Sequence, residues 1–281
     1  MNVLIVGGSK GSWHMRGRQL GAAMGARVTT RPNATDWATA DVIVLVKHAV
    51  DTWFREAKTS KAALIWDVLD YWPQPTGNQR DEHDLVREIL QVRDTLKIHQ
   101  LIAATEAMAT AIGGVYLPHH HRIGLSPAPV RSELQVVAYE GSPRYLGSWR
   151  VALEQVCARL GLSFVVNPRE LGQADLLVAF RGEQWDGWAC RQWKSGIKYV
   201  NAIAAGRPIL TQHSAAFGEI LPPGLIVEHP EALGLAIEYF APRDRRESAL
   251  QRARKKVDEF SVDRIAKRYQ AILQSAVGVA A

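Results

Sequence analysis

Short apolar runs alternate with amphipathic stretches along the first half of the chain, a pattern typical of buried strands separated by helices. Apolar positions recur at helical spacing over Asp81–Leu96, and another helix is expected to end near Met24. Strand–helix alternation of this kind predicts a parallel sheet that is covered on both faces. Its strands are expected at Val3–Val6, Val28–Arg31, Val42–Val46, Ala63–Trp66, Leu101–Ala104 and Val115–Leu117.

A second alternating set follows a stretch that is interrupted by Pro118, Pro127 and Pro129. We therefore place a domain boundary there, with an N-terminal domain of residues 1–128 and a C-terminal domain of residues 129–260. The length of 281 residues fits two domains. The second set comprises a helix at Arg150–Leu160 and strands at Gln135–Tyr139, Phe164–Val166, Leu176–Phe180, Pro208–Thr211 and Leu225–Val227.

The most informative segment of the chain runs from Lys194 to Leu210. Apolar residues at helical spacing predict a helix that ends at Gly206, and Ser195 is expected to cap its start. The first turn of a helix carries unpaired N–H donors and the positive end of the helix dipole, and Lys194 and Lys198 add charge there. This combination predicts a diphosphate site; ordinary capping beside two solvated lysines is the alternative.

Two other strand ends of the second set carry residues that suit a phosphorylated ligand. Gly141 would let the backbone approach a phosphate or a sugar closely, with Ser142 beside it, whereas the alternative for both residues is a simple turn. Arg181 ends the strand before the helix and could pair bidentately with phosphate or form a surface salt bridge. Because open parallel sheets bind ligands at the carboxyl ends of their strands, we expect these residues in the site.

The segment also resembles the donor-binding core of glycosyltransferases with the GT-B fold. The resemblance rests on the helix end and turn Ala204–Thr211 and on Phe217–Ile220 behind it. Many members carry a Glu, seven residues and a second Glu before this turn, where this chain has Trp193 and Asn201. The pattern S-x-x-K-x-x-N that ends at Asn201 resembles a variant found in some members.

The resemblance implies an α/β protein with two Rossmann-like, doubly wound domains facing a central cleft. The N-terminal domain would bind the acceptor, and the C-terminal domain would bind a nucleotide-diphosphate sugar, with a UDP-sugar favoured. Residues 261–276 resemble the C-terminal helix that crosses back to the N-terminal domain in this family. The implied donor-binding residues are Gly141, Ser142, Arg181, Lys194, Ser195, Lys198 and Asn201.

Two carboxylates follow the fourth predicted strand. Asp67 and Asp70, with Tyr71-Trp72-Pro73 after them, resemble the acidic loop that lines the cleft in many GT-B proteins. An inverting transfer needs one carboxylate as the general base, whereas in a retaining transfer both would orient hydroxyls. Asp67 is the first candidate for catalysis and Asp70 the second; an Asx turn or a cap is the alternative.

The glycine-rich loop Gly7–Trp13 is not a G-x-G-x-x-G fingerprint, and no acidic residue stands at the expected ribose distance, which argues against a nicotinamide dehydrogenase. In GT-B enzymes the equivalent loop helps to shape the acceptor site.

The consecutive histidines His119–His121 are not expected to bind a metal, because neighbours on an extended chain point to opposite sides. The family resemblance implies a metal-independent reaction with no cofactor besides the nucleotide sugar. The acceptor-binding candidates are Trp13, Arg16, Lys47, His48 and His119.

Composition and charge bear on the partners. The net charge of +6 and nine Trp residues suit a polyanion or a sugar, and basic residues cluster between Arg243 and Lys256, either for nucleic-acid contact or as a solvated helix face. Two cysteines give no disulfide framework, and no apolar run approaches the roughly 18 residues of a membrane helix. Because Met1 also leads directly into a strand, we expect a cytoplasmic protein with no membrane partner.

A compact, basic glycosyltransferase without a membrane-surface helix resembles the bacteriophage enzymes that glycosylate hydroxymethylated pyrimidines in DNA. This resemblance implies transfer of a hexose or a pentose to 5-hydroxymethylcytosine in double-stranded DNA, with the base extruded from the duplex, in the host-cell cytoplasm. Two alternatives stay open. One is a glycosyltransferase acting on a glycan or small metabolite, and the other is a non-catalytic nucleotide-sugar or nucleic-acid binding module.

Overall fold

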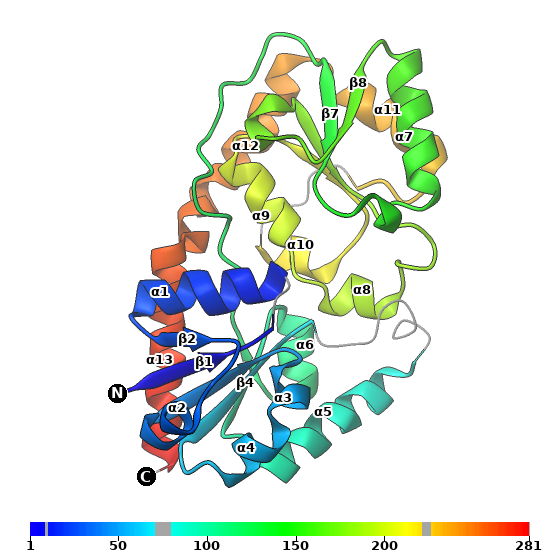
Figure 1. The fold of residues 1–281 in the computed structure, drawn as a ribbon. Helices are drawn as coiled ribbons and strands as arrows, with labels where there is room; N and C mark the ends of the chain where they lie inside the picture. Colours follow the sequence, from blue (N-terminus) through cyan, green and yellow to red (C-terminus); the bar gives the residue numbers. More distant parts are fainter. Residues whose placement is uncertain (9–10, 71–79, 221–225, 281) are drawn as a thin grey trace. The chain divides into compact units, whose positions relative to one another are not determined.

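The computed structural model describes residues 1–8, 11–70, 80–220 and 226–280, which form two compact units (Figure 1). Unit 1 takes its described residues from Met1–His120, Gln192–Ser195 and Phe260–Ala281. Unit 2 takes them from His121–Arg191 and Gly196–Glu259. Each unit contains one sheet, and the paired strands in both sheets are parallel, as the sequence predicted.

The sheet of unit 1 has six strands in the order β2-β1-β3-β4-β5-β6. The central strands β3 and β4 are buried along their whole length, which explains why they appear in the sequence as continuous apolar runs. The strands are β1 (Val3–Val6), β2 (Arg27–Thr29), β3 (Val42–Val46), β4 (Ala63–Leu69), β5 (Gln100–Ala103) and β6 (Val115–Tyr116).

Strand β4 extends three residues beyond the predicted end at Trp66. Its pairing with β5 shifts register between Asp67 and Leu69, and Leu69 has a left-handed backbone with φ of 58°. The apolar pair Val68 and Leu69 remains in the core, so Asp67 lies within the strand. Asp70 is therefore the first residue beyond the strand.

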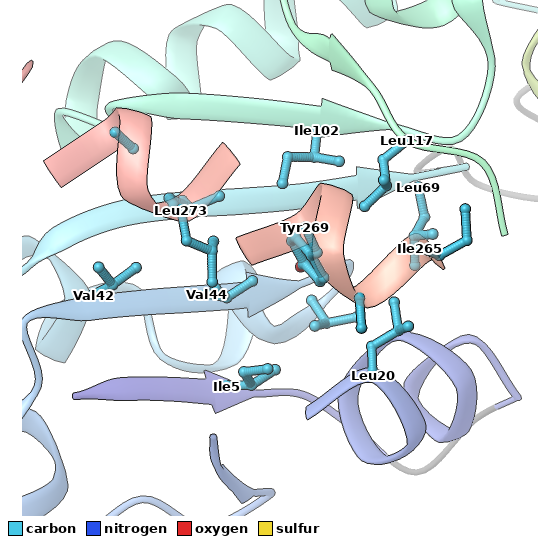
Figure 2. Packing of buried hydrophobic residues seen from close by; sticks show 14 of the residues in the cluster. Ile5, Leu20, Val42, Val44, Leu69, Ile102, Leu117, Ile265, Tyr269 and Leu273 are labelled. Carbon is cyan, nitrogen blue, oxygen red and sulfur yellow. The ribbon is translucent and has the colours of Figure 1, made fainter. Parts of the chain in front are cut away.

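The C-terminal helix α13 (Val262–Ala280) completes the core of unit 1. It contacts α1 and β4, and Figure 2 shows Tyr269 and Leu273 directed toward the sheet. Both side chains are fully buried in one apolar cluster with Val44 and Ile102. The other helices of unit 1 are η1 (Trp13–Gln19), α1 (Leu20–Met24), α2 (Ala34–Thr39), α3 (Ala49–Thr52), α4 (Phe54–Thr59), α5 (Glu82–Leu96) and α6 (Glu106–Ile112).

The sheet of unit 2 has four strands in the order β10-β9-β7-β8, namely β7 (Val136–Tyr139), β8 (Ser163–Val166), β9 (Leu176–Ala179) and β10 (Ile209–Thr211). The predicted strand Leu225–Val227 lies partly outside the described residues, and Ile226 forms an isolated bridge with Thr211. The helices are α7 (Ser148–Arg159), α9 (Ile197–Ala204), α10 (Ala215–Ile220), α11 (Leu233–Tyr239) and α12 (Arg243–Val257), with short helices η3 (Pro143–Tyr145), η4 (Leu171–Gln173) and η5 (Pro230–Ala232). Helices α8 (Trp188–Trp193) and η6 (Asp258–Phe260) each include residues of both units.

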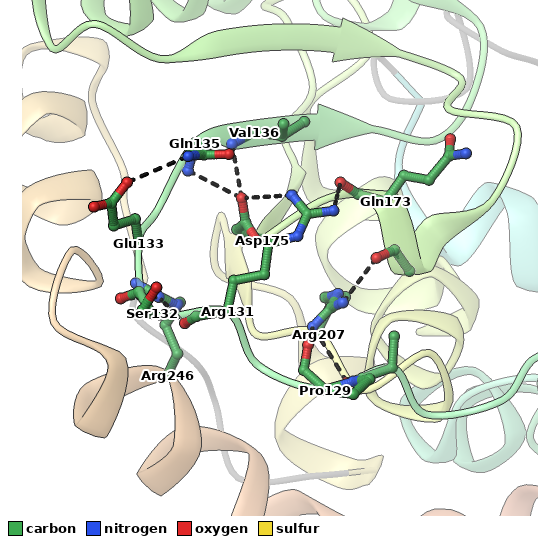
Figure 3. A network of polar contacts seen from close by, with 12 residues as sticks. Pro129, Arg131, Ser132, Glu133, Gln135, Val136, Gln173, Asp175, Arg207 and Arg246 are labelled. Carbon is green, nitrogen blue, oxygen red and sulfur yellow. Dashed lines mark hydrogen bonds and ion pairs between the residues drawn. The ribbon is translucent and has the colours of Figure 1, made fainter.

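A polar network fixes the segment that leads into β7 (Figure 3). The Asp175 carboxylate accepts backbone N–H bonds from Gln135 and Val136, each at 2.9 Å, and pairs with Arg131 at 3.3 Å. Two further arginines of this region, Arg207 and Arg246, are buried. Arg207 belongs to the turn on which the GT-B resemblance rests.

These two arginines donate their hydrogen bonds to backbone carbonyls. The acceptors of Arg207 include Ala128, Pro129 and Gly172, and those of Arg246 include Phe240 and Ser132. Each guanidinium therefore joins sequence-distant loops within unit 2. Arg246, a member of the basic cluster, is consequently a structural residue rather than part of an exposed charged surface.

Candidate functional site

The carboxyl end of β7 and the start of α9 form a basic corner of unit 2. Lys198 Nζ lies 3.7 Å from the centroid of the Tyr139 ring. A Cβ atom placed on Gly141 would lie 3.2 Å from this Nζ, and Gly141 has φ of 137°. Burial raises the pKa of Tyr139 to about 12, so its hydroxyl stays protonated at neutral pH. Because Gly141 has no Cβ atom, a phosphate bound to Lys198 could approach the backbone of Gly141 closely.

The start of α9 differs from the prediction. Its N-cap is Gly196 without a side-chain cap bond, so Ser195 does not cap the helix, and Ser195 belongs to unit 1. Since glycine has no side chain, the first-turn N–H groups depend on backbone, solvent or ligand. This is the arrangement that favours an anion at a helix start.

Two other predicted donor-binding residues lie near Tyr139. The Arg181 guanidinium lies 5.2 Å from the centroid of the Tyr145 ring, and its positive charge opposes the burial that raises the pKa of Tyr139. The Arg181 backbone N–H donates to Gln212 Oε1 at 2.6 Å. Ser142 follows Gly141 on the exposed loop, and its carbonyl accepts a 3.4 Å bond from the Tyr139 hydroxyl. The structure therefore brings Gly141, Ser142, Arg181 and Lys198 together.

Asn201 uses both ends of its amide within unit 2. Its Oδ1 accepts the backbone N–H of Arg122 at 2.8 Å, and its Nδ2 donates to Glu140 Oε2 at 3.2 Å. The Arg122 guanidinium donates to the other oxygen of Glu140 at 3.0 Å. Neither Glu140 nor Arg122 was among the predicted site residues. The signal for Glu140 was its position directly before Gly141 at a strand end.

In unit 1, Asp70 lies between two ammonium groups. Lys47 Nζ is 2.7 Å from Oδ1, and Lys194 donates to Oδ2. Burial alone would raise the pKa of Asp70, but the two lysines outweigh it and hold that pKa well below its usual range. Lys47 and Asp70 meet because β3 and β4 are parallel neighbours that end side by side. Lys194 thus binds a carboxylate of unit 1, although we had predicted it in the phosphate site with Lys198.

Asp67, our first catalytic candidate, has no exposed side-chain surface. The Tyr269 hydroxyl donates to its Oδ2 at 3.0 Å, and Arg16 Nε lies 3.6 Å from the same oxygen. Burial raises the pKa of Asp67, while Arg16 and Tyr269 oppose the rise. Arg16 is itself buried and donates to the carbonyl of Leu117. A direct contact between a substrate and Asp67 or Arg16 would require the core to open, so we correct both assignments to structural support.

The remaining acceptor candidates differ in exposure. The Trp13 ring is buried over Gly17, where a Cβ atom would lie 2.1 Å from it. His48 is about half exposed, and its Nδ1 lies 3.1 Å from an Asp51 carboxylate oxygen. His119 is buried, and burial together with the charge of Arg16 lowers its pKa, so the imidazole is neutral at pH 7. Its Nδ1 has no hydrogen-bond partner among the described residues.

Neither a metal-binding cluster nor a membrane-spanning helix is found among the described residues. Within the described residues, no three His, Cys, Asp or Glu side chains gather in a way that could hold a metal ion. None of the described helices combines the length and apolar character that crossing a bilayer requires. Tyr71-Trp72-Pro73 of the predicted acidic loop, and Ser9 and Lys10 of the glycine-rich loop, lie outside the described residues.

The chain is similar to known proteins in its fold but not in its sequence. No protein-family model matches the chain. No curated protein matches it in sequence. HepE of Anabaena, crystallised with UDP and glucose, is similar in structure with a TM-score of 0.68 and 12% identity over 98% of this chain and 100% of HepE.

Two further solved structures give the same result. The lipopolysaccharide outer core galactosyltransferase WaaB has a TM-score of 0.60 and 8% identity over 98% of this chain and 99% of WaaB. TarM has a TM-score of 0.59 and 11% identity over 83% of this chain and 54% of TarM. The chain therefore has the GT-B fold that the sequence predicted. None of the names of these three structures refers to DNA or to a bacteriophage.

Asp70 should make the stability of unit 1 depend on pH. Since its folded pKa is depressed, the ionised carboxylate stabilises the fold above its ordinary pKa of 3.8, and this contribution is lost as the pH falls toward the folded value. Asp70→Asn should therefore lower the melting temperature near pH 7, and the deficit should shrink as the pH falls below about 4. Thermal denaturation across this range checks the expectation.

The control for this experiment is Asp51→Asn, which removes a carboxylate that is 50% exposed. It should change the melting temperature little at any pH, because exposed ion pairs contribute about 0–1 kcal/mol. A deficit of Asp70→Asn that stays constant between about pH 7 and pH 3 would contradict the assigned interaction with Lys47 and Lys194.

Proposed function

We propose that the protein is a glycosyltransferase that moves a sugar from a nucleotide-diphosphate sugar to a hydroxyl acceptor. The observation that carries the proposal is the placement of Lys198 against Gly141 beside an uncapped helix start. A UDP-sugar is the favoured donor, and the UDP and glucose in the HepE complex support this choice. Gly141, Ser142, Arg181 and Lys198 are the proposed donor-binding residues.

In the proposed reaction, the bond between the anomeric carbon and the diphosphate oxygen breaks. A bond from the acceptor oxygen to that carbon forms, and the hydroxyl proton leaves with the departing diphosphate. The negative charge that develops on the diphosphate is stabilised by Lys198, Arg181 and the N–H groups at the start of α9. These groups supply the electrostatic stabilisation in a metal-independent reaction.

On the acceptor side we propose Asp70 in place of Asp67. A carboxylate that two lysines hold ionised is a weak proton acceptor, so Asp70 would orient a hydroxyl rather than deprotonate it. This favours a retaining transfer, which needs no general base. The neutral imidazole of His119 could accept a hydrogen bond from the acceptor hydroxyl, and Lys47 holds Asp70 in place.

The identity of the acceptor separates two versions of the proposal. Hydroxymethylcytosine in DNA stays a prediction from the sequence, and the exposed basic residues Arg245, Arg252 and Lys256 of α12 support it. The likeness to WaaB supports the alternative, a glycan or small-metabolite acceptor. Duplex DNA with hydroxymethylcytosine and a set of soluble sugars, each incubated with a panel of nucleotide sugars, would distinguish them by mass spectrometry.

A mass gain of one hexose or pentose on either acceptor would support the transferase and identify its acceptor. A gain on the sugars alone would remove the DNA version. Binding of nucleotide sugar without transfer or hydrolysis would favour the non-catalytic binding module instead.

Removing the charge of Lys198 should weaken donor binding. Lys198→Ala should raise the Kd for UDP about ten- to a hundredfold, because a hydrogen bond to a charged group contributes roughly 1.5–3 kcal/mol. Isothermal titration calorimetry measures the change. The matched control is Lys255→Ala, which removes an exposed lysine from α12 and should leave the Kd unchanged. If Lys198→Ala and Lys255→Ala bound UDP with equal affinity, the phosphate would not bind at Lys198.

A side chain at position 141 should weaken donor binding, because it would occupy space that the phosphate is proposed to fill. Gly141→Ala places a methyl group 3.2 Å from Lys198 Nζ and from the Tyr139 hydroxyl, where phosphate is proposed to bind. We expect at least a tenfold loss of UDP affinity, which corresponds to about 1.4 kcal/mol. Gly161→Ala is the control, because Gly161 also has positive φ (69°) but has nothing within 4 Å of the added Cβ.

The control tests whether a general loss of stability lowers the affinity. Both alanine variants should lose some thermal stability, since positive φ is unfavourable for alanine. Only Gly141→Ala should lose affinity. A similar loss of affinity in Gly161→Ala would show that the effect is general destabilisation.

A further inference from the structure

An arginine is buried at the centre of the first helix of unit 1. This helix, η1, is a π-helix of seven residues, a rare type that occurs frequently at functional sites. The Arg16 side chain has no exposed surface, so it cannot touch a substrate in the folded protein. Because a guanidinium is costly to bury, its hydrogen bonds indicate what this residue holds in place.

Two hydrogen bonds join η1 to the segment that follows β6. The Arg16 guanidinium donates to the carbonyl of Leu117. His120 Nε2 donates to the carbonyl of Met15 at 3.3 Å, since a carbonyl oxygen can only accept. Consecutive residues of η1 therefore hold the segment on both sides of His119. The imidazole of His119 depends on these anchors, because its own Nδ1 has no hydrogen-bond partner among the described residues.

His119 and Asp70 leave the sheet at the same edge. Leu69 is paired with Ala103, and Ala103 is paired with Tyr116, so the ends of β4, β5 and β6 are in register. Asp70 directly follows Leu69, and His119 follows Tyr116 by three residues. Because neighbouring strands lie about 5 Å apart, two strand spacings separate the points where the two segments begin.

The charges that act on the imidazole agree with this placement. Burial has the largest effect and lowers the pKa of His119. Arg16 and His120 lower it further, Asp70 opposes them, and Lys194 also lowers it. Lys194 donates to Asp70 as well. The imidazole and the carboxylate therefore share their charged neighbours.

We propose that η1 positions the imidazole of His119 beside Asp70, with Arg16 and His120 as the positioning residues. The inference rests on the proposed function, in which His119 and Asp70 bind the acceptor hydroxyl. Two groups can share one hydroxyl only if their separation is fixed, and a misplacement of about 1 Å can lower a rate about a hundredfold. The two bonds from η1 supply this constraint on the His119 side, as two lysines do on the Asp70 side.

The bond from His120 is tested by a pair of variants. His120→Leu removes the donor to Met15, whereas the side-chain amide of His120→Gln offers an N–H group in its place. With the acceptor that mass spectrometry identifies, kcat should fall at least about tenfold in His120→Leu and recover in His120→Gln. The Kd for UDP should keep its wild-type value in both variants, because the donor is proposed to bind to unit 2. Initial rates and calorimetry give these values.

The contacts of Arg16 are tested by a readout that does not depend on activity. Arg16→Met with Asp67→Asn removes a buried ion pair as a whole and leaves no unpaired charge in the core. The pKa of His119, followed by NMR, should then rise toward its ordinary value of 6.5, because the charge of Arg16 lowers it in the wild-type protein. The control is Arg27→Met with Asp36→Asn, which removes the ion pair of an exposed arginine and should leave this pKa unchanged.

Melting temperatures show whether each variant is folded, and if the double variant is unfolded, the His120 pair decides alone. A wild-type kcat in folded His120→Leu would overturn the positioning role while UDP binding and transfer stand. So would a pKa of His119 that does not move when Arg16 and Asp67 are replaced in a folded protein. Wild-type protein that neither binds UDP nor transfers a sugar would instead overturn the proposed function and this inference together.

Discussion

Parallel strand pairing is the constraint on which the candidate sites depend. In each sheet, the paired strands run in the same direction, so their carboxyl ends meet at one edge. This places Lys47 after β3 beside Asp70 after β4, although 23 positions separate them. In unit 2 it places the loop after β7 beside Arg181 after β9. Residues that are scattered in the sequence thereby become neighbours without any local motif that joins them.

The lysines of the two units lie in different electrostatic environments. In unit 1 one carboxylate lies between two ammonium groups, which makes Asp70 an anchored anion rather than a proton acceptor. In unit 2 Lys198 Nζ lies over the ring of Tyr139, and the face of an aromatic ring attracts a cation. The first arrangement suits the orientation of hydroxyl groups, and the second suits the binding of phosphate.

Much of the fold was predictable from the sequence, because buried parallel strands appear as uninterrupted apolar runs with helices between them. The start of β1 and the whole of β3 were predicted to the residue. The end of β4 was not, since nothing in the run Trp66 to Leu69 marks a register shift. Lys198, Gly141 and Arg181 became candidates through their positions, since each follows a strand or begins a helix.

The roles of the other residues depend on tertiary contacts that local patterns do not encode. Asp67 and Asp70 both follow the predicted strand. The sequence does not show that Asp67 lies within β4 against Tyr269, nor that Asp70 lies beyond a register shift and contacts two lysines. The pairing of Lys194 with Asp70 spans 124 positions. Glu140 stands directly before Gly141 at a strand end, but its contacts with Arg122 and Asn201, which are 18 and 61 positions away, appear only in the structure.

Helix α13 also affects the order in which the chain can fold during synthesis. All residues of unit 2 lie between positions 121 and 259, so they have left the ribosome before Tyr269 and Leu273 emerge. The sheet of unit 1 is translated first but lacks part of its apolar cover, and Asp67 lacks the hydrogen bond from the Tyr269 hydroxyl, until then. We therefore expect unit 2 to fold first and the nascent β1–β6 region to need protection from aggregation until α13 has been synthesised.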